Sequence, residues 1–104
     1  MQEQQAKSST LALPERLTIE VATSALADLT RAVGAQSGPV RLDASPMQDF
    51  DTSAVAVLLE LRRLLLAKGR EMAVDHWPPK LSALVRLYGV DTLLGVAPAA
   101  QATA

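Results

Sequence analysis

Apolar and polar positions alternate with two different periods along the chain, and the change of period separates predicted strands from predicted helices. Residues 10–13 form a short apolar run that stops at Pro14, which predicts a strand, because proline cannot donate to a sheet ladder. Residues 19–35 have the i, i+3, i+4 and i+7 apolar spacing of a helix with one buried face. The residues of this face are Ala22, Ala25, Leu26, Leu29, Ala32 and Val33.

The start of this first helix has two interpretations. In the first, Thr18 caps the helix and Gly34 or Gly38 ends it. In the second, the segment before the helix is an alternating strand formed by Leu17, Ile19 and Val21. The sequence alone leaves both interpretations open.

The middle of the chain repeats the order of strand and helix. Residues 40–44 predict a second strand, and a loop over 45–50 follows it. Residues 52–68 predict the longest helix, which Gly69 ends, because glycine readily adopts the left-handed conformation that closes a helix. Residues 71–75 then predict a third strand.

Two prolines, Pro78 and Pro79, mark the entry to a final helix that Gly89 closes. Its shared apolar face consists of Leu81, Leu84, Val85 and Tyr88. Residues 90–94 predict one further helical turn. Strands that alternate with helices in this way predict an α/β fold with a largely parallel sheet and right-handed crossovers.

The length of 104 residues predicts a single domain over residues 10–95. The polar segment 1–9 is expected to be disordered, and the Ala-rich segment 96–104 is expected to be a flexible tail. Neither a signal-peptide core nor an apolar run long enough for a membrane span occurs in the sequence, so we expect a cytoplasmic protein.

Composition narrows the class of function. The net charge of −1 gives no electrostatic footprint for nucleic acid or for an anionic membrane surface. Cysteine is absent, which excludes disulfides and thiolate chemistry from this sequence. The single histidine, His76, next to Trp77, is more typical of a structural residue than of a metal ligand.

The remaining candidate chemistry is a group of three carboxylates, Asp43, Asp49 and Asp51. They resemble a magnesium or phosphoacceptor site, and a small hydrolase or nucleotide-binding enzyme is the function they would suggest. No lysine or further oxygen ligand stands at a supporting position, and no glycine-rich phosphate loop occurs. The sequence therefore favours a protein that is not an enzyme and needs no cofactor.

The start of the longest helix combines three polar residues. Asp51 stands where a carboxylate can cap the free N–H groups of the first turn. Thr52 and Ser53 add two adjacent hydroxyls at an end of the helix that favours a phosphate, so both are candidate phosphorylation sites.

The same helix is apolar over more of its circumference than one sheet face requires. Its main stripe consists of Val57, Leu58, Leu61, Leu64 and Leu65, and beside it lie Val55, Leu59 and Leu66, interrupted by Arg62. Burial against neighbouring helices is one explanation, and a surface that binds another protein is the other. The residues predicted to contact a partner are Asp51, Thr52, Val55, Leu59 and Arg62.

Several motifs resemble the STAS domain family, which includes anti-anti-sigma factors and sulfate-transporter tails. They are the strand-end motif Val-Arg-Leu-Asp-Ala-Ser at 40–45, the helix start Asp-Thr-Ser-Ala at 51–54 and the helix end Lys-Gly at 68–69. The resemblance implies a small mixed, largely parallel sheet with helices packed mainly on one side. It covers residues 11–94.

Within that family the chain is most similar to the small STAS subunit of Mla-type phospholipid ABC transporters. The similar segments are Leu-Ala-Leu at 11–13, Leu-Thr at 17–18, Asp-Thr at 51–52 and Leu-Tyr-Gly-Val at 87–90. This resemblance implies that Thr52 faces an MlaF-like ATPase subunit, within a complex that includes the permease at the inner membrane. It also implies that the chain stabilises or activates the ATPase and performs no chemistry itself.

The anti-anti-sigma factors offer an alternative function. In them the second hydroxyl of the helix-start motif takes a phosphate from an anti-sigma factor kinase, and that position is Ser53 here. The chain departs from their pattern at Ala54, where the family usually has glycine, and at Thr18, where it often has aspartate. Both branches of the family remain open on the sequence alone.

Overall fold

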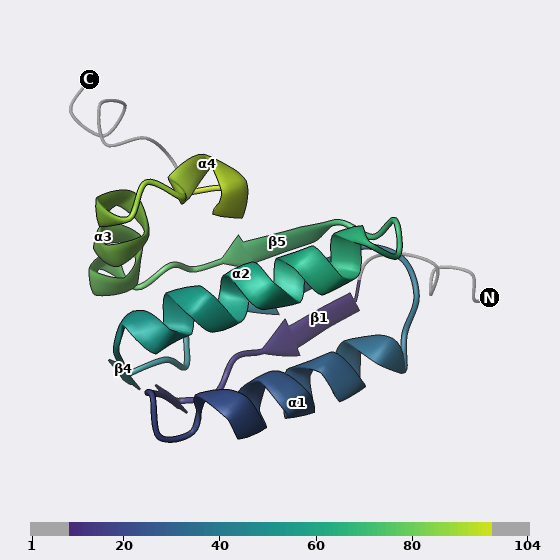
Figure 1. The fold of residues 1–104 in the computed structure, drawn as a ribbon, viewed down its shortest axis with the longest axis horizontal. Coiled ribbons are helices and arrows are strands. Elements are labelled where there is room, and N and C mark those ends of the chain that lie inside the picture. The colour runs from purple at the N-terminus through teal and green to yellow at the C-terminus, as the bar shows by residue number, and fades with distance from the viewer. Residues whose placement is uncertain (1–8, 97–104) are drawn as a thin grey trace.

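The computed structural model describes residues 9–96 of the chain (Figure 1). Strands β1 (Ser9–Ala12), β3 (Val40–Asp43) and β5 (Met72–Asp75) form a parallel sheet in the order β1-β3-β5. The two-residue strands β2 (Arg16–Leu17) and β4 (Asp49–Phe50) pair in parallel beside it. The predicted α/β class with a parallel sheet is confirmed.

Two long helices, α1 (Ala22–Gly34) and α2 (Thr52–Leu66), lie side by side over one face of this sheet (Figure 1). Helix α3 (Pro79–Leu87) packs against α2, and the short helix α4 (Asp91–Leu94) contacts β5. Because α1 and α2 each follow one strand of a parallel sheet, they run in the same direction. Their amino ends therefore lie together.

The core lies between the sheet and the two long helices, and aliphatic side chains fill it. The largest fully buried side chains are Leu13, Leu17, Val40, Leu42, Leu58, Leu61, Leu65, Leu81 and Val85. Burial of apolar surface contributes about 25 cal/mol per Å², and it is the main contribution to the stability of a domain of this size.

The face of the sheet opposite the core is polar. In β3, the exposed Arg41 lies between the buried Val40 and Leu42, as the two-residue period of a half-buried strand requires. The Arg41 guanidinium donates to both carboxylate oxygens of Asp75 on β5, with distances of 2.8 and 2.6 Å. This pair lowers the pKa of the Asp75 carboxyl.

Several element boundaries differ from the sequence-based predictions, most of all at the start of the first helix. Helix α1 begins at Ala22, because the Val21 N–H donates to the Thr18 carbonyl at 3.0 Å and closes a turn first. The predicted Thr18 cap was wrong: the residue at the capping position is Val21, and no side chain caps it. The alternative strand was correct only at Leu17, since Ile19 lies in this turn.

The end of α2 agrees with the sequence. Gly69 has a φ of 71° and donates its N–H to the Leu66 carbonyl at 2.9 Å, while the next N–H, from Arg70, reaches the Leu65 carbonyl at 2.9 Å. The predicted glycine stop is confirmed. The segments expected to be disordered or flexible lie outside the described residues, except for Ser9, the first residue of β1, and Val96, which is buried.

Candidate docking site at the start of helix α2

Asp51 holds together the two segments that lead into α1 and α2. Its Oδ1 accepts the Ser53 N–H at 2.8 Å, which makes it the amino-terminal cap of α2, as predicted. Its Oδ2 accepts the backbone N–H of Ile19 at 3.0 Å, from the turn before α1. The hydrogen bonds from Ile19 and Ser53 lower the pKa of the Asp51 carboxyl. Both carboxylate oxygens are therefore engaged within the chain.

The two hydroxyl residues after Asp51 have opposite environments. Thr52 is exposed to solvent, whereas Ser53 is buried, with only 9% of its surface accessible. The residue after them, Ala54, is completely buried, so the chain turns inward directly after Thr52. Of the two candidate phosphorylation sites, only Thr52 is therefore exposed to solvent.

Two shallow apolar grooves flank α2 near Thr52. The first groove, of about 380 Å³, separates α1 from α2, and its lining residues are Ile19, Ala22, Thr23, Leu26, Ser53, Ala56, Val57 and Glu60. The second, of about 320 Å³, lies between α2 and the end of α3 and is lined by Thr52, Val55, Ala56, Leu59 and Tyr88. The residues of these two grooves together are called the amino-end face below. Ala56, which is exposed, lines both grooves.

Two large apolar side chains of the amino-end face are exposed. Ile19 has 71% of its surface accessible, and Tyr88 has 55%. Apolar periodicity places Ile19 in the first helix or in the alternative strand before it, and Tyr88 on the buried face of the last helix, because periodicity cannot show which element packs beside them. In the sequence, the only indication that these two side chains are exposed is their position next to a turn.

The predicted contact residues have different positions in the structure, and Asp51, the cap of α2, lines neither groove. Thr52 and Leu59 line the second groove, and Leu59 is half-buried. Val55 is 4% exposed, so it forms the floor of the groove and belongs mainly to the core. Arg62 is half-buried one turn beyond Leu59 and lines neither groove.

Most of the wide apolar stripe of α2 packs inside the domain. Val57, Leu58, Leu61 and Leu65 are buried, and α2 contacts α1, α3 and α4. Packing against neighbouring helices therefore explains most of the width of this stripe, although Leu66, near the carboxyl end of α2, is 47% exposed.

The three carboxylates that suggested an enzyme have separate partners. Asp43 accepts the Ser45 N–H at 3.0 Å and lies 3.0 Å from His76 Nδ1, and these contacts lower its pKa. Asp49 lies 3.4 Å from Arg16 Nε, and Asp51 caps α2. Across residues 9–96, no three His, Asp or Glu side chains are grouped so that they could hold a metal ion.

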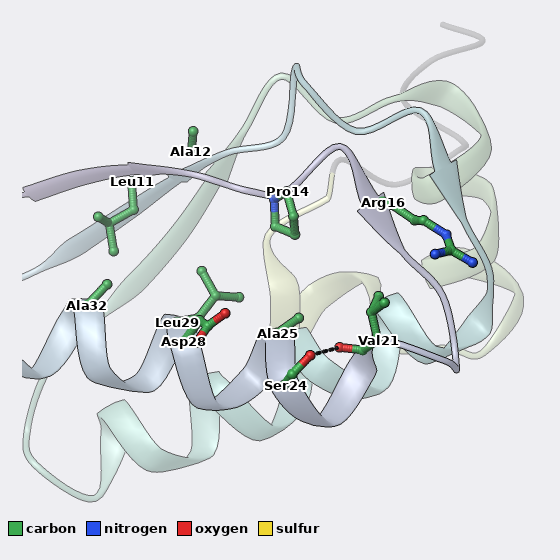
Figure 2. A pocket seen from close by; sticks show the side chains of 10 residues that line it. All are labelled: Leu11, Ala12, Pro14, Arg16, Val21, Ser24, Ala25, Asp28, Leu29 and Ala32. Carbon is green, nitrogen blue, oxygen red and sulfur yellow. Dashed lines mark hydrogen bonds between the residues drawn. The ribbon is translucent and has the colours of Figure 1, made fainter.

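A further groove lies on the opposite flank of α1, between this helix and the edge strand β1 (Figure 2). Its volume is about 380 Å³, and its walls include Leu11, Pro14 and Leu29. The Ser24 hydroxyl at its border donates to the Val21 carbonyl at 3.1 Å (Figure 2). Arg16, also at the border, forms ion pairs with Glu20 and Asp49.

Comparison with known proteins identifies the class of this domain. The crystal structure of a sulfate transporter family protein from Wolinella succinogenes superposes with a TM-score of 0.68, over 85% of this chain and 71% of that chain. The two sequences are 14% identical, so the likeness establishes a shared fold. No curated protein matches the sequence.

The family follows from the sequence match. Residues 1–95 match the family model described as "Mlab, STAS domain", and the chain therefore belongs to the MlaB-type STAS domain family. A STAS domain is typically a non-catalytic interaction domain with a regulatory or accessory role. None of the helices in the part of the chain that the structure describes is long and apolar enough to span a membrane.

Proposed function

We propose that this chain is the accessory STAS subunit of an Mla-type phospholipid ABC transporter and that it binds the ATPase subunit through the amino-end face. The family match supports the transporter assignment. The observation that supports the binding site is the exposure of Thr52 at the second apolar groove, while its neighbours Asp51 and Ser53 are engaged or buried.

The amino-end face has the physical character of a protein-binding surface. The exposed apolar groups of Ile19 and Tyr88 would be removed from water on docking, which contributes about 25 cal/mol per Å². Thr52 lines the same groove as Tyr88 and supplies a hydroxyl that can donate and accept a hydrogen bond. Protein interfaces typically have an apolar centre with polar groups at its border, and the amino-end face has this arrangement.

The chain would act on the ATPase by allostery, in the cytoplasm and at the inner membrane through its partner. A subunit that binds one conformation of the ATPase more tightly shifts the equilibrium toward that conformation. By reciprocity, the nucleotide state of the ATPase then changes its affinity for this chain. Such a role requires a rigid docking surface and no catalytic residue.

The alternative of a phosphorylation switch at Ser53 has less support from the structure. The Ser53 N–H is bonded to Asp51, and its side chain is buried. A phosphate there would place about two negative charges beside the Asp51 carboxylate, which is electrostatically unfavourable. Incubation with a co-encoded anti-sigma factor kinase, followed by intact mass measurement, distinguishes the two functions, because an added phosphate is expected only for the switch.

Co-purification with the ATPase subunit encoded alongside this chain tests the proposal. We expect Thr52→Glu to weaken the association at least tenfold, because docking would bury the new charge without a partner. The matched control is Thr92→Glu, since Thr92 is also exposed near a helix start but lies on α4, outside the amino-end face. Equal association of wild type and Thr52→Glu would contradict the proposed site.

A further inference from the structure

The carboxylate of Asp51 does more than cap a helix. A cap needs one oxygen, and Oδ1 fulfils that role by accepting the Ser53 N–H. Oδ2 accepts an N–H that is 32 residues away in the sequence, that of Ile19. The second bond leaves the cap of α2 unchanged and instead ties the turn before α1 to the amino end of α2.

The turn that carries Ile19 follows directly on β2, which pairs with β4, and its Glu20 forms an ion pair with Arg16. Its Thr18 hydroxyl is buried without a hydrogen-bond partner, and the side chain of Ile19 is 71% exposed. Helix α1 has no side-chain cap of its own. Within the turn, the bond from the Val21 N–H to the Thr18 carbonyl sets the local shape but not its position relative to α2.

We propose that Asp51 is a positioning residue, which fixes Ile19 at the mouth of the groove between α1 and α2 so that a partner meets a preformed groove. This inference rests on the proposed function, because the groove belongs to the amino-end face. Asp51 then acts through Ile19 and makes no contact with the partner. A groove that is already ordered loses less conformational entropy on binding, and the association is correspondingly tighter.

The substitution Asp51→Asn separates the two roles of the carboxylate. Asparagine is as good a cap as aspartate, so its single amide oxygen retains the bond from Ser53. Its NH₂ group then faces the Ile19 N–H, and two donors cannot bond. Asp51→Ser, which offers one capping oxygen, provides a second variant with the same expectation.

Amide hydrogen exchange of the free protein, measured by NMR, tests the positioning without any partner. We expect the Ile19 amide to exchange at least tenfold faster in Asp51→Asn and in Asp51→Ser, while the Ser53 amide changes by less than about threefold. Unchanged exchange at Ile19 in both variants would overturn the inference, whatever the partner is.

Binding to the co-encoded ATPase subunit tests how the positioning acts. We expect Asp51→Asn and Ile19→Ala each to weaken binding about five- to tenfold, and the double variant to be no weaker than Ile19→Ala alone. Additive losses would show that Asp51 touches the partner directly and would overturn the inference. If wild type does not bind the ATPase, the proposed function fails, and the exchange experiment still decides whether Asp51 holds Ile19.

Discussion

Helices α1 and α2 lie side by side (Figure 1), and at each end of the pair one charged side chain joins the chain segments that meet there. At the amino ends, the Asp51 carboxylate accepts the N–H of Ile19. At the carboxyl ends, the Arg70 guanidinium donates to the Val33 carbonyl of α1 and to the Gly38 carbonyl, both at 2.8 Å. Each charge also has the sign that the helix dipoles favour at its end.

The ends differ in what surrounds the charged group. Arg70 is half-buried, and it donates to the Val33 carbonyl in the last turn of α1 and to the Gly38 carbonyl in the loop that follows. Asp51 lies beside two open grooves and the exposed Ile19. The carboxyl end of the helix pair is thus closed by a half-buried charge, whereas the amino end leaves Thr52 and two apolar grooves exposed, where we propose that a partner docks.

The largest effect on stability is expected from Arg70→Met. This variant removes the bond to Val33 in α1 and the bond to Gly38 in the following loop, and hydrogen bonds to charged groups contribute about 1.5–3 kcal/mol each. Arg70 Nη2 is buried without a hydrogen-bond partner, and this cost already reduces the net contribution of Arg70. We therefore expect the free energy of unfolding to fall by about 2 kcal/mol. Urea unfolding measures this loss of stability. The control is Arg70→Lys, because lysine keeps the positive charge but lacks the guanidinium group. A loss below about 0.5 kcal/mol would show that this end is not fastened by Arg70.

A smaller loss is expected from Gly69→Ala. The added methyl group meets open space, so the only cost is the left-handed backbone at a φ of 71°, about 1 kcal/mol. Gly34→Ala is the matched control, because Gly34 also has open space around it but lies in α1 without a positive φ. There alanine is expected to be neutral or to stabilise by up to about 1 kcal/mol, since it favours a helix. Equal thermal unfolding shifts for both variants would contradict this reasoning.

At the amino ends, the stability contribution of Asp51 is expected to depend on pH. Its pKa is lowered in the folded state by the bonds from Ile19 and Ser53, relative to about 3.9 in the unfolded chain. The stabilisation is therefore fully present above pH of about 4 and is lost as the pH falls through the lowered folded pKa. The free energies of unfolding of wild type and Asp51→Asn, measured in urea, should differ at pH 7 and become equal at low pH. A difference that stays constant with pH would contradict the role of this carboxylate.

The smallest stability effect is expected from Ile19→Ser, which alters an exposed side chain and should change unfolding by less than about 0.5 kcal/mol. Its effect belongs to binding: association with the ATPase subunit should weaken several-fold, because apolar contact in the first groove is lost. Leu87→Ser is the control, since Leu87 is 75% exposed but lines neither groove. If both variants bind alike, Ile19 is not part of the docking surface.

The features that the sequence predicted correctly depend on local chemistry. The cap at Asp51 and the stop at Gly69 follow from backbone groups within a few residues, so they can be recognised from the residue types alone. The order of strands and helices likewise follows from apolar periodicity.

The features that it missed depend on residues far apart in the chain. The turn at Ile19 is joined to Asp51, 32 residues away, and periodicity continued the helix through that turn because it contains no such information. Ser53 and Thr52 are alike in sequence, and only the packing of α2 on its neighbours makes one buried and the other exposed. The width of the apolar stripe on α2 also had two explanations, which only the positions of α1 and α3 distinguish.

A hydrogen-exchange footprint of the chain in complex with its ATPase subunit tests the central claim most directly. The account predicts slower exchange over residues 19–26 and 52–60, at the amino ends of α1 and α2, and unchanged exchange around Arg70 at the carboxyl ends. Protection confined to the carboxyl ends, or to the polar sheet face around Arg41, would contradict it.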